Sequence, residues 1–286
     1  CSAASKEAHR LFDARQLSGT VVIEDVVTGH VIVEASILSE REAGLPVSSI
    51  SSILPLSTSK LVLAASIWTH ADVFPDRQDL DRRVHELLVH SLDDEGRKLA
   101  IDERARVGSR AVLADLARYG LPECALHDKD NTNFDRNFAG DFSEPIPVGR
   151  ACTTLNEGRD DLSWSSALSL GEEQFSLSPF HLTRVLQAIG NDGVALAPIF
   201  RRRGDQRVER PASERVEIMT PAVARLLQRA LRDTVAVGTA KGIRDRLRGG
   251  WHVGGKTGTT ALYGEPFDGI FAGLVSDPND RARYGN

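Results

Sequence analysis

Two short segments, far apart in the chain, carry residue types that together could perform nucleophilic catalysis. Ser57 is followed three positions later by Lys60, and Lys256 begins the string Lys-Thr-Gly near the end of the sequence. A serine hydroxyl becomes a strong nucleophile when a neighbouring base removes its proton, and a desolvated lysine can be that base. Ser-x-x-Lys alone is a weak signal, because chance supplies about half a match in a chain of this composition. The ordered pair of strings is far less expected by chance.

Lysine usage supports the same interpretation. Of the 35 basic residues only six are lysine, which leaves 29 arginines. Arginine stays charged in any protein setting, whereas a lysine can lose its proton when it is buried or lies beside another cation. Since this chain uses arginine wherever a surface cation suffices, we expect Lys60 at a position that requires a proton acceptor.

The segment that carries Ser57 and Lys60 predicts a buried helix. Residues 56–65 are apolar on nearly every face, which is typical of a helix in the middle of a protein. We expect Ser57 in the first turn, where free N–H groups and the helix dipole favour a developing negative charge. Ser57 and Lys60 then lie on one face, within reach of each other.

Strand patterns occur near both ends of the chain, and helical patterns fill the middle. Strands are expected in a hairpin over 19–34, in a short pair near 195–217, and over 251–260 and 269–275. Helices are expected over 2–16, 80–90, 94–105, 109–119, 179–190 and 221–235, and loops over 43–55 and 124–161. This order predicts an α+β fold, in which an antiparallel sheet packs against helices with a mainly helical lobe and the active site lies between them.

The charge and composition of the chain argue against nucleic acid, a membrane surface and a metal as partners. The net charge of −5 and the pI near 5.9 give no reason to expect nucleic acid or an anionic membrane surface. No apolar stretch approaches the roughly 20 residues of a membrane span. Since no His, Cys or Asp spacing indicates a metal site, we expect neither a metal nor a cofactor.

The three cysteines leave alternatives open. Cys124 and Cys152 bracket a polar loop and could pair in an oxidising compartment, or they could be two unrelated thiols. Cys1 followed by Ser and Ala is what a mature bacterial lipoprotein shows, and it is equally consistent with an arbitrary start of the sequence.

The ordered strings resemble those of penicillin-binding protein transpeptidase domains, which have the serine β-lactamases as relatives. That superfamily shows Ser-x-x-Lys, then Ser-x-Asn, then Lys-Thr/Ser-Gly. Further similarity lies in Gly238-Thr239-Ala240, in 175–179, in 188–191 and in Phe271-Ala272-Gly273. The resemblance covers about 19–276 and implies one transpeptidase-like domain over 1–286. Its sheet part would span about 1–45 and 236–286 and its helical lobe about 46–235.

The middle string departs from the family pattern. Its best candidate is Ser91-Leu92-Asp93, in which Asp stands where Asn is usual. An ionised Asp only accepts hydrogen bonds, whereas an Asn also donates, and a carboxylate beside Lys60 would hold that lysine in its charged form. We therefore expect Asp93 to be protonated in place or rotated away, or acylation to be impaired. Ser91 could also be a plain helix N-cap.

The resemblance implies roles for eight residues. The catalytic set would be Ser57, Lys60, Ser91 and Asp93, with Ser57 as nucleophile, Lys60 as base and Ser91 as the relay to the leaving amine. The substrate-binding set would be Lys256, Thr257, Gly258 and Thr259, and the backbone N–H groups of Ser57 and Thr259 would hold the oxyanion. The implied substrate is a D-Ala-D-Ala stem peptide of peptidoglycan, with β-lactams as covalent inhibitors and no nucleic acid as partner.

Three function classes follow. A D,D-transpeptidase or carboxypeptidase is favoured over a serine β-lactamase, because the Glu-x-x-Leu-Asn string of one lactamase class is absent and Tyr119-Gly120-Leu121 keeps only part of another class's Tyr-Gly-Asn. Asp93 supports the third class, a non-catalytic β-lactam sensor or scaffold. The resemblance also implies an extracytoplasmic or periplasmic place, with a possible membrane anchor outside the sequence. It implies a C-terminal truncation too, since the family has a further strand and helix.

Overall fold

The fold is known from a computed structural model, which describes residues 3–14, 18–37, 53–121, 152–171, 175–199, 215–247, 249–262 and 265–277. Its helices are α1 Ala3–Asp13, η1 Leu56–Ser59, α2 Lys60–Thr69, η2 Ala71–Val73, α3 Arg77–His90, α4 Asp93–Val107, α5 Ser109–Arg118, α6 Asp161–Leu170, α7 Pro179–Gly190, α8 Pro221–Ala236 and α9 Lys241–Arg244, where η marks a 3-10 helix. Its strands are β1 Gly19–Glu24, β2 Val31–Ile37, β3 Cys152–Thr153, β4 Phe175–Ser176, β5 Val194–Leu196, β6 Arg215–Glu217, β7 His252–Leu262 and β8 Glu265–Ser276.

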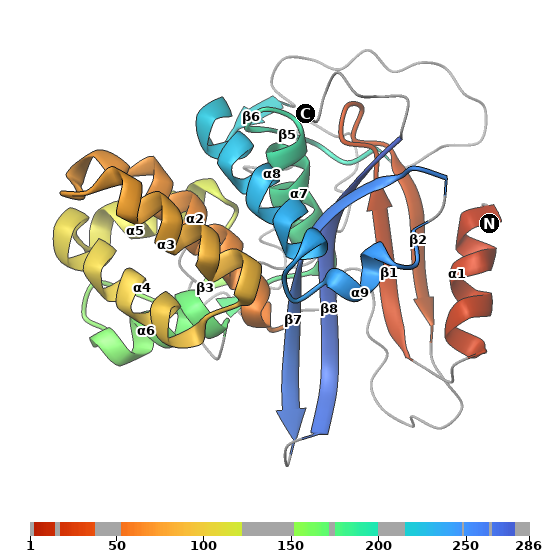
Figure 1. Cartoon of the computed structure of the whole chain (residues 1–286), viewed down its shortest axis with the longest axis horizontal. Coiled ribbons are helices and arrows are strands. Elements are labelled where there is room, and N and C mark those ends of the chain that lie inside the picture. Colours follow the sequence, from red (N-terminus) through yellow and green to blue (C-terminus); the bar gives the residue numbers. More distant parts are fainter. Residues whose placement is uncertain are drawn as a thin grey trace, which may run out of the picture.

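The strands pair in antiparallel fashion, as the α+β prediction requires. β1 pairs with β2 and β7 with β8, and within the described residues each hairpin is a separate two-stranded sheet. Figure 1 shows helices α2 to α6 on one side of the β7–β8 hairpin, and β1, β2 and α1 on the other. The β7–β8 hairpin therefore lies between the helical lobe and the N-terminal hairpin, and β7 contacts α8 and η1.

The N-terminal hairpin shows how sequence pattern sets local packing. Val33, Ala35 and Ile37 are buried and alternate with exposed residues along β2, as the two-residue period of a strand requires. They form a small cluster with Phe12 of α1 and Val21 of β1. The expected hairpin and the expected N-terminal amphipathic helix are both present.

The central helix is buried on all sides, as its sequence predicts. Every residue of α2 from Lys60 to Trp68 is buried in the main core. Ser57, however, lies in the 3-10 helix η1 rather than in the first turn of an α-helix. The preceding Leu56 has a φ of 53°, a left-handed conformation that interrupts α-helical geometry just before Ser57.

Two α-helices, α6 and the short α9, lie where no helix is expected from the sequence. Residues 161–170, at and after the end of the predicted polar loop, form α6, which the Asp160 side chain caps by accepting from Ser163 N. Within the predicted loop over 124–161, residues 152–153 form the short strand β3, and 124–151, with Cys124, lies outside the described residues, as do Cys1 and 38–52. Among the helices described, none is long and apolar enough to cross a membrane.

A buried carboxyl group in α4 makes the stability of the fold depend on pH. Glu103 is fully buried, and neither of its carboxyl oxygens has a hydrogen-bond partner among the described residues. Burial, with a smaller contribution from the charge of Asp115, raises the pKa of Glu103 from 4.5 to about 8. Unfolding exposes the group, so its ionisation favours the unfolded chain wherever the pH lies between these two values.

Glu103→Gln is expected to remove this pH dependence. Because the folded pKa lies above the unfolded one, stability is retained below about pH 4.5 and is lost as the pH rises to about 8. The variant should gain stability over the parent between pH 5 and pH 8.5, by a difference on the order of 3 kcal/mol. Urea unfolding of both proteins at the two pH values measures it. An equal pH dependence in the two proteins would contradict an uncharged Glu103.

Candidate active site

Ser57 and Lys60 lie in contact at the junction of η1 and α2. The Lys60 ammonium donates to Ser57 Oγ at 2.8 Å, which matches the expected one-face arrangement of the pair. The Lys60 side chain is fully buried, whereas Ser57 is half-buried and therefore open to a ligand on one side. This geometry places a nucleophile candidate beside a proton acceptor.

The protonation of Lys60 is decided by two opposing effects. Burial lowers the pKa of Lys60, and the nearby charge of Arg97 acts in the same direction. The hydrogen bond and charge of Asp93 oppose them, but the net direction is downward. Asp93 thus favours the charged form of Lys60, as expected from the sequence, and burial of the ammonium acts against it.

Asp93 is the first residue of α4 and points toward Lys60. Its Oδ1 accepts from Lys60 Nζ at 2.7 Å, while its side chain remains 53% exposed. Of the alternatives drawn from the sequence, an Asp93 rotated away is wrong, because the start of α4 carries this side chain directly to the buried ammonium. Lys60 thus donates both to the hydroxyl of Ser57 and to this carboxylate.

Ser91 faces the second lysine of the site. It ends α3 as a left-handed C-cap with φ 56° and ψ 45°, so the alternative of a plain N-cap is wrong. Lys256 Nζ donates to Ser91 Oγ at 2.8 Å and to the carbonyl of Thr257 at 2.8 Å. The left-handed turn separates α3 from α4 and lets Ser91 reach β7 while Asp93 reaches α2.

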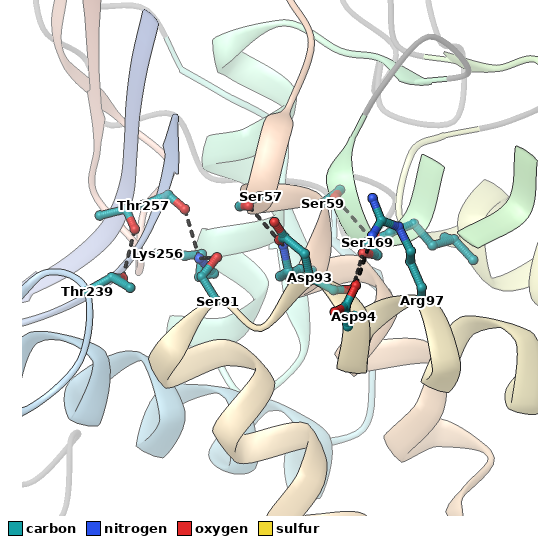
Figure 2. A network of polar contacts seen from close by, with 12 residues as sticks. Ser57, Ser59, Ser91, Asp93, Asp94, Arg97, Ser169, Thr239, Lys256 and Thr257 are labelled. Carbon is teal, nitrogen blue, oxygen red and sulfur yellow. Dashed lines mark hydrogen bonds and ion pairs between the residues drawn. The ribbon is translucent and has the colours of Figure 1, made fainter. Parts of the chain in front are cut away.

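Lys256 is not an ordinary lysine of an exposed strand. Its side chain is fully buried, and burial together with the charge of Lys60 lowers its pKa to about 7, against a smaller opposing effect of Asp93. The neighbouring Thr257 Oγ1 lies 2.8 Å from Thr239 Oγ1. Figure 2 shows how this network runs from Thr239 through Lys256 and Ser91 to the region of Ser57 and Asp93.

The backbone of β7 also lies close to residues 55–59, here called the nucleophile segment because they carry Ser57, the candidate nucleophile. A Cβ added at Gly258 would lie 3.3 Å from the Pro55 carbonyl oxygen and 3.4 Å from the Ser57 nitrogen. The absence of a side chain at Gly258 therefore lets the strand pack directly beside the backbone of Ser57. Thr259, one position further, is exposed beside this contact.

Solved structures and a family model show which known proteins have a similar fold. Penicillin-binding protein 3 from Mycobacterium tuberculosis, complexed with aztreonam, has a TM-score of 0.64 and 18% identity over 96% of this chain and 68% of its own. The D,D-transpeptidase domain of a peptidoglycan glycosyltransferase from Eggerthella lenta has a TM-score of 0.66 and 16% identity. This match covers 99% of the present chain and 75% of the Eggerthella lenta chain. Residues 148–282 match the family model of the penicillin-binding protein transpeptidase domain. The chain has the fold of such a transpeptidase domain.

Further solved structures agree with this transpeptidase fold. The transpeptidase domain of penicillin-binding protein 3 from Burkholderia pseudomallei has a TM-score of 0.61 and 18% identity, over 98% of this chain and 81% of its own. No curated protein sequence is similar to the chain. The family resemblance drawn from the three strings is thus confirmed by the fold and by the family model.

All eight expected site residues of this transpeptidase-like domain lie on η1, α2, the α3–α4 junction and β7. Within the part of the chain that the structure describes, no three His, Cys, Asp or Glu side chains are grouped to hold a metal ion. The network also contains residues that the sequence did not single out for the site, namely Thr239, Ser59, Ser169 and Arg97. Thr239 belongs to the Gly-Thr-Ala string already noted, whereas no sequence signal distinguishes the other three.

Proposed function

We propose that this domain is a penicillin-binding serine D,D-transpeptidase or carboxypeptidase that acts on peptidoglycan stem peptides through an acyl-enzyme on Ser57. The observation that carries the proposal is the contact of 2.8 Å between Ser57 Oγ and the buried Lys60 ammonium, whose pKa burial lowers. A lysine with a lowered pKa can be neutral near the pH at which it works, and only the neutral amine accepts a proton.

In the first step Ser57 Oγ attacks the carbonyl carbon between the two D-alanines. Lys60 takes the hydroxyl proton as the new C–O bond forms, and the carbonyl oxygen gains the negative charge. The backbone N–H groups of Ser57 and Thr259 would stabilise that oxyanion. The close approach of Gly258 to the Ser57 nitrogen supports this assignment, because it brings the β7 backbone beside the nucleophile.

Collapse of the intermediate breaks the peptide C–N bond, and the leaving D-alanine amine needs a proton. Ser91 would relay to it the proton that Lys60 took from Ser57, which returns Lys60 to its neutral form, while the Lys256 ammonium stays charged and holds Ser91 through the bond to its Oγ. The ester on Ser57 is then attacked by the amine of a second stem peptide or by water, with Lys60 accepting the proton of the incoming group. The first outcome is transpeptidation, and the second is carboxypeptidation.

The terminal carboxylate of the stem peptide would bind at β7. Lys256 supplies a positive charge, and the hydroxyls of Thr257 and Thr259 supply donors. Thr239, hydrogen-bonded to Thr257, would orient that hydroxyl. β-Lactams carry a carboxylate beside a reactive amide and would be captured in the same way, with Ser57 acylated by the opened ring.

The charge of Lys256 makes the selectivity for a carboxylate pH-dependent. With a pKa of about 7, Lys256 is charged below that pH and increasingly neutral above it. We expect kcat/KM for a peptide ending in a free carboxylate, divided by that of its carboxamide analogue, to fall roughly tenfold from pH 6.5 to pH 8.5. The ratio cancels the titration of Lys60, which serves both substrates. A ratio that stays constant would exclude Lys256 as the carboxylate anchor.

The proposed substrate places the domain outside the cytoplasmic membrane, where peptidoglycan is cross-linked. We therefore propose an extracytoplasmic location in the bacterial cell envelope, with any anchor supplied by sequence beyond the described residues.

Fluorescent penicillin labelling followed by a washout chase tests the function. A penicillin-binding transpeptidase should become labelled and keep the label through the chase, because its acyl-enzyme reacts slowly with water. A label that is lost within minutes would favour a β-lactamase. A protein that never takes up label would be a non-catalytic scaffold. A stably labelled protein that fails to release D-alanine from a D-Ala-D-Ala peptide would be a β-lactam sensor.

A further inference from the structure

The carboxyl end of α6 contacts both halves of the catalytic network. We propose that Leu168, Ser169 and Gly171, here called the α6 clasp, set the spacing between the nucleophile segment and the start of α4 that carries Asp93. Ser59 and Ser169 are then positioning residues, since their hydroxyls donate to backbone carbonyls and not to Ser57 Oγ or Lys60 Nζ. Figure 2 draws this part of the network, with Ser59 and Ser169 beyond Ser57 and Asp93.

The first contact joins α6 to the nucleophile segment. Ser59 Oγ donates to the carbonyl of Leu168 at 3.1 Å, and both residues are buried. Ser59 stands between Thr58 and Lys60, so this bond fixes the backbone on which the buried lysine begins. A carbonyl in the last turn of a helix has no intrahelical partner, and here a side chain of another element supplies one.

The second contact joins α6 to the start of α4. Ser169 Oγ, fully buried, donates to the backbone carbonyl of Asp93 at 3.1 Å. A Cβ added at Gly96 would lie 2.9 Å from Ser169 Oγ, so α4 packs against this serine with no room for a side chain. These contacts hold the first turn of α4, which begins at Asp93, against Ser169.

The third contact places the end of α6 against the backbone just before the nucleophile. Gly171 caps α6 in a left-handed conformation with φ 67°. A Cβ there would lie 2.4 Å from the carbonyl oxygen and 2.5 Å from the nitrogen of Leu56, distances that no side chain can occupy. Leu56 is itself held at a positive φ, and Gly171 packs against that conformation.

Spacing matters because Lys60 divides its hydrogen bonds between the two segments. Its ammonium lies 2.8 Å from Ser57 Oγ and 2.7 Å from Asp93 Oδ1, so a shift of α4 changes the balance between the two. Asp93 raises the pKa of Lys60, which burial lowers. A looser clasp should weaken the Asp93 contact and let the pKa of Lys60 fall further.

The decisive measurement is the titration of Lys60 in Ser169→Ala. With six lysines in the chain, protein labelled with carbon-13 at the lysine ε-carbon gives few resonances, and Lys60→Arg assigns the Lys60 signal. We expect Lys60 to titrate at lower pH in Ser169→Ala than in the parent. Ser165→Ala is the matched control, because this serine is also buried in α6 but donates within its own helix to Leu162 O at 3.0 Å.

The second readout is the rate of acylation by fluorescent penicillin, and this part rests on the proposed function. Ser169→Ala should slow labelling by ~10- to 100-fold, as displacements of about 1 Å do in active sites, whereas Ser165→Ala should stay within about twofold of the parent. Ser59→Ala, which opens the other half of the clasp, serves if Ser169→Ala does not fold.

The outcomes separate the two proposals. If the parent takes up no penicillin, the proposed function fails, and the Lys60 titration alone decides the clasp. A Lys60 titration that is unchanged in Ser169→Ala, or in Ser59→Ala where that variant is needed, overturns the clasp whatever the labelling rate. A shift in the clasp variant with none in Ser165→Ala supports it.

Discussion

Ser57→Ala is expected to abolish covalent labelling by fluorescent penicillin while the domain stays folded. Under the proposed function the ester of the acyl-enzyme would form on Ser57 Oγ, the hydroxyl oxygen to which the Lys60 ammonium donates. Lys60 keeps Asp93 as a partner in the variant, so the buried ammonium is not left unpaired. We expect the labelling rate of Ser57→Ala to be at least ~1,000-fold lower than that of the parent, which is the level of nonspecific labelling.

Gel fluorescence and intact mass measure this loss, with circular dichroism to confirm the fold. Ser165→Ala is again the matched substitution, a buried serine outside the network that should be labelled like the parent. A mass increase equal to one penicillin that persists in Ser57→Ala would place the nucleophile at another residue.

Lys60→Arg should lower the rate of acylation by about 100- to 10,000-fold, the range that general-base catalysis contributes. Arginine keeps a positive charge and donors for Ser57 and Asp93, but it cannot accept a proton. The variant therefore tests whether Lys60 acts as a base or only as a cation. Lys60→Met, which removes the charge at similar length, should lose a comparable factor. The labelling rates of both variants, measured from pH 6 to pH 9, provide the comparison.

Lys98→Arg is the control for this exchange, because Lys98 is an exposed lysine on α4, the helix that carries Asp93. It should be labelled at the parent's rate. Should Lys60→Arg retain most of the parent's rate, Lys60 would be an electrostatic partner, and another group would have to remove the serine proton.

Local features of the site follow from the sequence because they depend on near neighbours in the chain. Ser57 and Lys60 share a face because three residues separate them, and the all-apolar segment places Lys60 in the core. The β7–β8 hairpin is likewise expected from two strand patterns, and it brings Lys256 and Thr257 onto one strand. The contact between Lys256 and Ser91 spans most of the chain, and only the family resemblance anticipated that they share a site.

Two parts of the site could not be predicted for physical reasons. The sign of the Lys60 shift depends on how burial compares with the charge of Asp93, and burial is a property of the folded core. α6 escaped prediction because its sequence, DLSWSSALSL, contains four serines, which favour caps and turns over helix interiors. Tertiary packing overrides that preference, as Trp164 and Leu168 are fully buried.

The two buried lysines of the network have a joint consequence. The charge of Lys60 lowers the pKa of Lys256, and by reciprocity the charge of Lys256 disfavours a proton on Lys60. The two amines therefore form a coupled pair, in which a proton on one disfavours a proton on the other, while Asp93 accepts from Lys60. If such a pair holds one proton, one amine can accept the proton of Ser57 and the other carries the charge that would bind the carboxylate of the proposed substrate. A carboxylate that binds at Lys256 would draw the proton to that lysine and leave Lys60 neutral. Substrate binding itself would then prepare Lys60 to accept the proton of Ser57.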